Sequence, residues 1–247
     1  MAWPKTRAEP ELLGMAPSSA VRLTPRTRAP RGQSQGCCYH IRVPHIPDSN
    51  PPRALRTVFL DRDGVLNRKL PEGRYISSPS LFQPLPGVPS AIARLNRAGI
   101  RVLVVTNQRG IALGHYTVAD VNAIHAAFQN ALKAHGAHVD AFYFCPHDKE
   151  QCNCRKPLPG LYKHAVKDFP DVSGQTSAMV GDSWSDIEFG RRLGMTTVFI
   201  DINPELQKPG AESAREMADL NAASLPEAVD TLLAHPTPAG DPQHASL

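Results

Sequence analysis

The sequence predicts an α/β fold built on a doubly wound parallel sheet with helices on both faces. Three observations predict it. Short apolar runs alternate along the chain with segments of helical periodicity. The central runs are apolar at nearly every position, as strands covered on both faces are. Several runs end at a polar residue, and parallel sheets bind their ligands at the carboxyl ends of the strands.

The first half of the predicted sheet begins near residue 57. Thr57–Asp61 (TVFLD) is an apolar run that stops at a carboxylate, which predicts the first strand. Pro86–Gly99 is predicted to be a helix, because apolar residues recur at helical spacing and a glycine ends it. Ile100–Thr106 (IRVLVVT) is nearly all apolar and rich in β-branched residues, which predicts a central strand. A long helix is predicted from Thr117 to about His135.

The second half repeats the alternation of strands and helices. Three apolar runs are predicted to be strands: Asp140–Cys145, Ser177–Asp182 and Thr196–Ile200. Three segments are predicted to be helices: Pro159–Phe169, Ser183–Leu193 and Ser224–Leu233. Pairs with capping-box spacing mark three helix starts: Thr117 with Asp120, Ser183 with Asp186, and Ser224 with Glu227. Together these elements predict a Rossmann-like sheet.

The charge of the chain is concentrated in its first segment. Residues 1–56 hold nine basic and three acidic residues, whereas the remaining 191 residues hold 18 basic and 20 acidic ones. The net charge of +4 therefore comes from the leading segment, and a basic nucleic-acid-binding surface on the folded part is not indicated. Residues 1–53 are rich in Pro, Arg and Ser without periodicity, which predicts a disordered tail. We expect one folded domain over residues 54–236 and a second disordered tail over residues 237–247.

The composition excludes several classes of protein. No apolar run approaches the ~20 residues that a membrane-spanning helix needs, and the first residues lack the apolar stretch of a secretory signal. The five cysteines are odd in number and clustered, which argues against a disulfide framework and for a reducing compartment or a metal site. We therefore expect a cytoplasmic protein that does not bind membranes.

Carboxylates follow two of the predicted strands. Asp61 and Asp63 stand two residues apart in the motif DRDG, so both can face one cleft beyond the strand end. One could act as a nucleophile and the other as a proton donor and acceptor. Asp182 ends a later strand and Asp186 follows one turn on, in the motif GDSWSD. Hard oxygen ligands of this kind suit Mg²⁺ together with water and phosphate.

Further polar side chains are predicted at the same edge of the sheet. Thr106 and Asn107 offer a hydroxyl and an amide after the second strand, and Lys156 offers a positive charge for a phosphate oxygen. Each feature alone is weak evidence, because two aspartates so close together usually belong to a turn. Their order along the chain predicts a single catalytic site.

A second constellation predicts a structural zinc site. Cys145, His147, Cys152 and Cys154 lie within ten residues, in the order C-x-H-x4-C-x-C. Three thiolates and one imidazole complete a tetrahedral ligand set. Because the protein fills all four positions, the site is predicted to be structural and not catalytic. The zinc loop would then fix Lys156, which follows it by two residues.

The order of the motifs DxDG, TN, Lys and GDxxxD resembles the haloacid dehalogenase superfamily of phosphotransferases over residues 57–200. The resemblance implies that Asp61 is the nucleophile that forms an aspartyl-phosphate. It implies that Asp63 protonates the leaving alcohol and then activates water. Thr106 would orient the phosphoryl group, and Lys156 would stabilise its charge. The implied magnesium ligands are Asp61, the backbone carbonyl of Asp63 and Asp182, with Asp186 supporting them.

The zinc loop CNCRKPLPG, the opening DRDGVLN and the central NQRGIALG narrow the resemblance to the heptose-bisphosphate phosphatases, which remove the 7-phosphate of D-glycero-D-manno-heptose 1,7-bisphosphate. Histidinol-phosphate phosphatases share the zinc loop and are the alternative. Two segments depart from the pattern: the zinc loop is shorter than expected, and Arg68–Tyr75 is slightly longer. No stretch is long enough for a large cap domain, so a minimal cap is expected. The implied substrate contacts are Asn67, Asn107, Gln108, Arg109 and Arg155.

Two hypotheses belong to other classes. A nucleic-acid end-processing or binding module could use the basic tail, but the near-neutral body and the lack of interleaved aromatic residues in the tail count against it. A catalytically inactive, zinc-stabilised scaffold is disfavoured by the complete set of carboxylates and lysine. We expect a monomer that acts on a small phosphorylated sugar or a similar metabolite.

Overall fold

The structure is a computed structural model that describes residues 54–201 and 204–234 of the chain. The two predicted tails, residues 1–53 and 237–247, lie outside the described residues. What the structure describes falls within the single domain predicted for residues 54–236.

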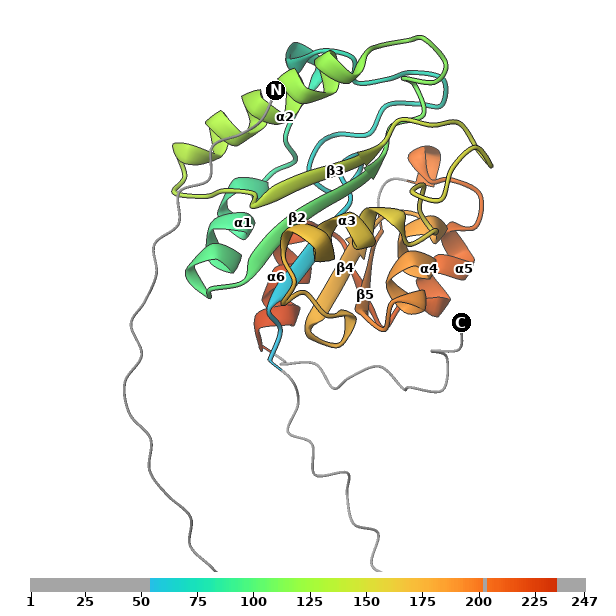
Figure 1. The fold of residues 1–247 in the computed structure, drawn as a ribbon. Helices are drawn as coiled ribbons and strands as arrows, with labels where there is room; N and C mark the ends of the chain where they lie inside the picture. The colour runs from blue at the N-terminus through green and yellow to red at the C-terminus, as the bar shows by residue number, and fades with distance from the viewer. Residues whose placement is uncertain (1–53, 202–203, 235–247) are drawn as a thin grey trace, which may run out of the picture. The chain divides into compact units, whose positions relative to one another are not determined.

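The core of the structure is a sheet of six parallel strands in the order β3-β2-β1-β4-β5-β6 (Figure 1). The predicted fold class is therefore confirmed, and each of the five predicted strands is present. The strands are β1 (Thr57–Leu60), β2 (Arg101–Asn107), β3 (Ala141–Cys145), β4 (Ser177–Gly181), β5 (Thr196–Ile200) and β6 (Leu220–Ala222).

The direction in which the sheet grows reverses beside β1. The chain first adds β2 and then β3 on one side of β1, and then crosses back to add β4 on the other side. Strand β1 pairs with both neighbours, with Leu60 opposite Val104 on one side and Val180 on the other. Because the connections leave β1 and β4 toward opposite sides, the carboxyl ends of these two strands form the switch point at which doubly wound sheets bind ligands.

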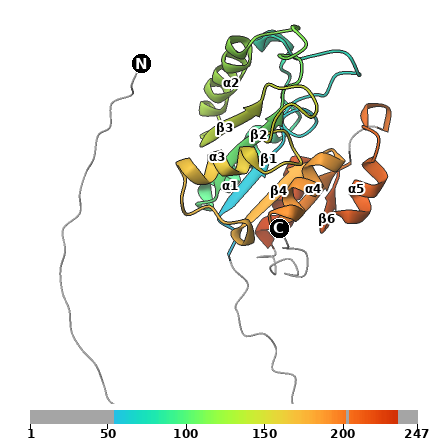
Figure 2. The ribbon, with the colours of Figure 1, turned by 45° about the vertical axis from the view of Figure 1, so that its right-hand side comes forward.

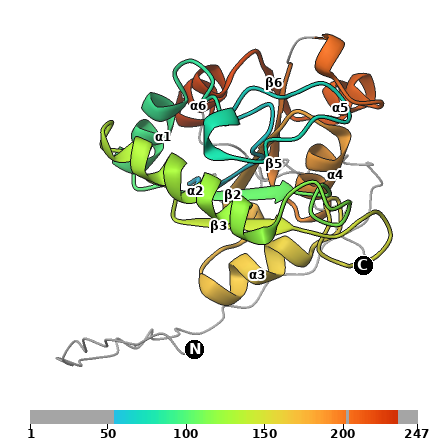
Figure 3. The ribbon, with the colours of Figure 1, turned by 90° about the horizontal axis from the view of Figure 1, so that it is seen from above.

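Helices cover both faces of the sheet. Side chains alternate along β1, so that Val58 and Leu60 join the core with α1, α2 and α6, whereas Phe59 joins the core with α3 and α4. Helix α5 packs with α4 and β5 in a third, smaller cluster. Helices α3 and α4 lie in front of the sheet in Figure 2, with α5 to their right, and α1 and α6 lie side by side in Figure 3. The helices are α1 (Val88–Arg97), α2 (Val118–Lys133), α3 (Gly160–Asp168), α4 (Trp184–Arg192), α5 (Ala211–Met217) and α6 (Leu225–Ala234).

Two elements were not predicted from the sequence. Strand β6 has only three residues with a polar one between two apolar ones, and α5 has only seven, so neither shows a clear period. The capping boxes of α2 and α4 are confirmed. The box predicted for α6 is incomplete: the carboxylate of Glu227 accepts from the backbone amide of Ala223, one residue before the expected Ser224.

The segment between β1 and α1 contains a short 3-10 helix, η1 (Pro79–Leu81), as its only helical turn. Two other 3-10 helices, η2 (Gly174–Thr176) and η3 (Pro204–Leu206), precede β4 and α5. Among residues 54–201 and 204–234 no helix or strand forms a separate cap. None of the helices in this part of the chain has the length and apolar character that crossing a membrane requires.

Candidate active site and metal centres

Asp61 lies at the middle of the site, directly after β1. Asp61 follows the last residue of β1, and its backbone amide donates to the carbonyl of Val180 in β4, 2.9 Å away. This bond extends the sheet by one residue and fixes the carboxylate at the strand end. The side chain of Asp61 is 10% exposed, so it is mostly buried but still accessible from solvent.

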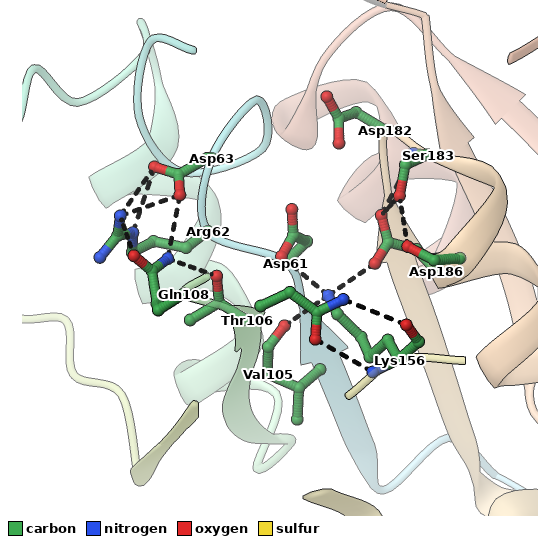
Figure 4. A network of polar contacts seen from close by, with 12 residues as sticks. Asp61, Arg62, Asp63, Val105, Thr106, Gln108, Lys156, Asp182, Ser183 and Asp186 are labelled. Carbon is green, nitrogen blue, oxygen red and sulfur yellow. Dashed lines mark hydrogen bonds and ion pairs between the residues drawn. The ribbon is translucent and has the colours of Figure 1, made fainter. Parts of the chain in front are cut away.

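Lys156 connects Asp61 with a second carboxylate (Figure 4). The Lys156 ammonium lies 2.8 Å from Asp61 Oδ1 and 2.5 Å from Asp186 Oδ1. It also donates to the backbone carbonyl of Val105, at 2.6 Å. The side chain is 1% exposed, and its ammonium has two hydrogen-bond acceptors and an ion pair with Asp186. Lys156 is therefore a fixed point charge at the strand ends.

Asn107 holds the backbone of Lys156 in place. Its side-chain amide donates to the carbonyl of Lys156 at 3.1 Å, and its side-chain oxygen accepts from the amide of Lys156 at 3.0 Å. Both backbone groups of the lysine are thus satisfied by one side chain from β2, 49 positions away in the sequence. The predicted contact between Asn107 and substrate stays a prediction.

The carboxylate of Asp63 is held in a separate hydrogen-bond network (Figure 4). Arg62 donates to both of its oxygens, at 3.1 and 2.8 Å from the same nitrogen. Asn67 donates to Asp63 Oδ1 at 3.0 Å, and Gln108 donates to Asp63 Oδ2 at 3.1 Å. Gln108 also donates to the hydroxyl of Thr106, at 2.9 Å. Asn67 and Gln108 are buried and support Asp63; the sequence predicted them as substrate contacts, which stays a prediction.

Arg62 is the member of this network that the sequence analysis missed. It lies inside the motif DRDG and is 1% exposed, although an arginine in a turn is ordinarily solvated. Its position between two aspartates was the only available signal. Burial alone would raise the pKa of Asp63, but the charge and hydrogen bonds of Arg62 hold that pKa below its usual value.

Three carboxylates gather around the end of β1 and β4. One oxygen each from Asp61, Asp182 and Asp186 lies within 4.8 Å of the other two. Burial raises the pKa of Asp61 and raises that of Asp182 to about 6, because each charge is costly there. Burial would also raise the pKa of Asp186, but the contact with Lys156 holds it below the usual value. Lys156 and Lys69 offset two of these three negative charges, and a divalent cation supplies the positive charge that is still missing.

The surroundings of Asp182 suit a small cation bound by oxygen ligands. Asp182 Oδ1 is buried and accepts no hydrogen bond, while Oδ2 is paired with Lys69. A Cβ on Gly64 would lie 2.4 Å from Asp182 Oδ2, so the backbone after Asp63 passes directly over this carboxylate. Gly64 also has a φ of 101°, which side chains rarely adopt. These residues fit the predicted magnesium site, with Asp186 held by Lys156 and Ser183 behind it.

The predicted zinc ligands lie together at the end of β3. Ligand atoms of Cys145, His147, Cys152 and Cys154 lie within 4.8 Å of one another. Cys145 Sγ lies 3.5 Å from Cys152 Sγ, and His147 Nδ1 lies 3.3 Å from Cys154 Sγ. Bonds of about 2.3 Å around a tetrahedral zinc ion place neighbouring ligand atoms about 3.5–3.8 Å apart. The three described cysteines form no disulfide.

Without a cation this cluster would not hold three thiolates. Burial raises the pKa of Cys145, and burial and the two neighbouring sulfurs raise the pKa of Cys154 above its usual value. A divalent ion reverses this preference, because thiolates are its ligands. The loop also packs tightly on α3, since a Cβ on Gly160 would lie 2.5 Å from the Cα of Cys154. The residues therefore fit a structural zinc ion.

Two predicted substrate contacts lie near the zinc loop. Arg109 forms an ion pair with Asp148, the residue after His147, and its side chain is 38% exposed. Arg155 directly precedes Lys156, and its Nη1 is buried without a hydrogen-bond partner. Neither arginine contacts the three carboxylates, and their role toward a substrate stays a prediction.

Comparisons with known proteins agree with this geometry. A family model described as haloacid dehalogenase-like hydrolase matches residues 53–194. The chain is 40% identical over 137 residues to a D-glycero-alpha-D-manno-heptose-1,7-bisphosphate 7-phosphatase of Mycobacterium bovis, covering 55% of this chain and 72% of that protein. It is also 40% identical over 141 residues to a D-glycero-beta-D-manno-heptose-1,7-bisphosphate 7-phosphatase of Bordetella bronchiseptica, covering 57% and 77%.

Solved structures of heptose bisphosphate phosphatases are also similar to this chain. The structure resembles that of D,D-heptose 1,7-bisphosphate phosphatase from B. bronchiseptica in complex with magnesium and phosphate. The TM-score is 0.62 at 32% identity, and the match covers 73% of this chain and 99% of that one. The corresponding enzyme from Burkholderia thailandensis matches with a TM-score of 0.52 at 30% identity, over 73% and 99% of the two chains.

Proposed function

The chain belongs to the haloacid dehalogenase-like hydrolase family and is a phosphatase, and we propose that it removes the 7-phosphate of D-glycero-D-manno-heptose 1,7-bisphosphate. One observation carries the proposed chemistry. Asp61 lies at the switch point of the sheet, and the buried ammonium of Lys156 is 2.8 Å from its carboxylate. Asp182 belongs to the same cluster of carboxylates, and one of its oxygens accepts no hydrogen bond. Such a site accepts a dianionic phosphate only beside positive charge.

In this proposal Asp61 is the nucleophile. Its carboxylate attacks the phosphorus of the 7-phosphate, the bond from phosphorus to the sugar oxygen breaks, and the product is an aspartyl-phosphate. Lys156 stabilises the charge on the phosphoryl oxygens from a fixed position, because its ammonium has no room to move. The same ammonium opposes the effect of burial and favours the ionised, nucleophilic form of Asp61.

Asp63 is proposed to move the proton. Its lowered pKa keeps it ionised in the resting site, which suits the second step, in which it takes a proton from the attacking water. For the first step it must bring a proton to the leaving sugar oxygen. Arg62 opposes that uptake until the negative charge of a bound phosphate raises the pKa of Asp63. In this proposal, Arg62 thus sets the pKa at which Asp63 changes between proton donor in the first step and proton acceptor in the second.

Two metals complete the proposal. Asp61, Asp182 and the backbone carbonyl of Asp63 would hold Mg²⁺, which offsets the repulsion between carboxylate and phosphate. Cys145, His147, Cys152 and Cys154 would hold Zn²⁺ and fix the loop that carries Lys156. We further propose a cytoplasmic monomer, as expected from its cysteine usage.

The substrate is tested by direct comparison. The purified chain with Mg²⁺ is assayed for phosphate release from the α and β anomers of D-glycero-D-manno-heptose 1,7-bisphosphate and from histidinol phosphate. We expect kcat/KM for one heptose anomer to exceed that for histidinol phosphate at least a hundredfold. The relatives named for the two anomers are equally similar to this chain, so the assay also decides the anomer. A preference for histidinol phosphate would reject the proposed substrate.

A further inference from the structure

Lys69 reaches the carboxylate cluster from the loop that follows the DRDG motif. Its ammonium donates to Asp182 Oδ2 and forms an ion pair with it. The side chain of Lys69 is 10% exposed, and that of Asp182 is fully buried. The lysine is therefore withdrawn from solvent to neutralise a carboxylate that would otherwise carry its charge in the interior.

Asp182 is also one of the proposed magnesium ligands. Its other oxygen, Oδ1, is buried and accepts no hydrogen bond. An ammonium and a divalent cation compete for the same carboxylate, because each is stabilised by its negative charge and each is repelled by the other. A cation bound at Asp182 must therefore displace the ammonium of Lys69 or weaken its contact.

Beside the carboxylates, Lys69 lines a pocket. The pocket has a volume of about 380 Å³, and Arg68, Gln83, Leu81 and Leu206 are among its other walls. Sites for small molecules begin at about 300 Å³. Lys69 thus borders both the pocket and Asp182, and the pocket offers space for a displaced ammonium. A phosphorylated sugar offers it hydroxyl or phosphate oxygens there.

We propose that Lys69 is a tethered cation that neutralises Asp182 before Mg²⁺ binds and turns to the substrate in the adjoining pocket once Mg²⁺ takes its place. The proposal rests on the proposed function of the site. It makes Lys69 a positioning residue for the metal and a specificity-determining residue for the sugar. The loop of Arg68–Tyr75, which is slightly longer than the family resemblance implies, would thereby acquire a role.

The test measures Mg²⁺ binding directly. Isothermal titration gives the Kd of Mg²⁺ for wild type, Lys69→Gln and Lys208→Gln, without any substrate. Lys208 is the matched control, because its positive charge also lowers the pKa of Asp61, Asp182 and Asp186, but it makes no ion pair with them. We expect Lys69→Gln to bind Mg²⁺ about tenfold more tightly and Lys208→Gln to stay within threefold of wild type.

Thermal unfolding provides a second readout. Without Mg²⁺, Lys69→Gln leaves Asp182 without its counter-ion, so its Tm should fall; saturating Mg²⁺ should then raise the Tm by more than it does in wild type. In kinetics, Lys69→Gln should raise KM for heptose bisphosphate at least fivefold.

Each result decides one part of the proposal. Equal Kd values for wild type and Lys69→Gln, or equal tightening in Lys208→Gln, would overturn the displacement of the lysine by the metal. Tighter Mg²⁺ binding with an unchanged KM would overturn the contact with substrate. A folded wild-type chain that binds no Mg²⁺ would instead reject the magnesium-dependent function itself, and the exchange with it.

Discussion

The side chain of Asn107 bonds both backbone groups of Lys156, at 3.1 Å to its carbonyl and 3.0 Å from its amide. The ammonium of Lys156 is positioned by its contacts with carboxylate and carbonyl oxygens, whereas the backbone of Lys156 is positioned by the side-chain amide of Asn107. Because both backbone groups of Lys156 bond to Asn107, the position of the charge depends on that side chain. Precise placement of a charge is what electrostatic stabilisation of a phosphoryl group requires.

Asn107→Ala should therefore lower both stability and activity. The loss of two buried hydrogen bonds should lower the free energy of unfolding by about 1–3 kcal/mol. The freed lysine should lower kcat at least tenfold, a change of ~1.4 kcal/mol in the barrier. Asn130→Ala, on the exposed face of α2, is the control and should change neither quantity. An unchanged kcat in a folded Asn107→Ala variant would show that the clamp does not serve catalysis. Denaturant unfolding and steady-state kinetics on the three proteins provide the measurements.

Removal of one zinc ligand should destabilise the protein and impair binding together. Cys152→Ser should contain less than one zinc per chain by elemental analysis, melt at a lower temperature and show a higher KM. The reason is that the loop from β3 to Lys156 derives its shape from the metal. Mg²⁺ affinity should change little, since its proposed ligands lie elsewhere. Cys37→Ser, outside the described residues, is the matched control. A wild-type chain with full activity and no zinc would remove this site from the account.

His125 should make stability depend on pH. It is 5% exposed, stacks on Phe142 with ring centroids 4.4 Å apart, and burial lowers its pKa to about 3. Below about pH 6.5 the unfolded chain binds a proton at His125, whereas the folded protein does not. Proton binding therefore favours the unfolded state, and stability falls as the pH falls through that value. Between pH 7 and pH 5 the loss should be about 2 kcal/mol.

His125→Phe keeps the aromatic packing without the titrating nitrogen and should flatten this part of the profile. Urea unfolding of both proteins at pH 5, 6 and 7 measures it. A variant whose stability falls by as much as that of wild type between pH 7 and pH 5 would contradict the assignment. His135→Phe, in the exposed segment after α2, is the control.

The first 50 residues should be dispensable for catalysis. A chain that begins at Pro51 keeps every residue of the site and of the described fold. We expect it to turn over heptose bisphosphate within twofold of the full chain. Lower activity toward this small substrate would show that the N-terminal segment takes part in the site. An equal rate combined with loss of binding to nucleic acid would favour a separate role for the segment.

The sequence predicted the elements that have a clear period and the residues that belong to motifs. The strand ends placed Asp61, Thr106 and Asp182 at one edge, because parallel strands share their direction. Strand β6 escaped prediction because it has three residues, and its pairing with β5 comes from tertiary packing. Sequence spacing likewise predicted that Cys145, His147, Cys152 and Cys154 lie together, because all four fall within ten residues.

The direction of individual side chains could not be predicted. The sequence did not show that the amide of Asn107 bonds to the lysine backbone, and its predicted contact with substrate stays a prediction. Arg62, for which the sequence analysis made no prediction, is buried against Asp63. The contact of Lys69 with Asp182 depends on the path of an irregular loop over the edge of the sheet. The sequence of such a loop has no periodicity from which its path could be predicted. The contacts of Asn107 and Lys69 form between segments far apart in the chain, where local patterns carry no information.

The central claim is that a phosphoryl group is transferred to Asp61, and trapping the intermediate tests it most directly. The enzyme is mixed with excess heptose bisphosphate and Mg²⁺, quenched in the steady state and treated with borohydride, which reduces an aspartyl-phosphate to homoserine. Peptide mass spectrometry then locates the change. The account predicts homoserine at position 61 in wild type and none in Asp61→Asn, which should also lose at least a thousandfold in kcat while keeping its fold. Homoserine at another aspartate, or turnover by Asp61→Asn within tenfold of wild type, would contradict it.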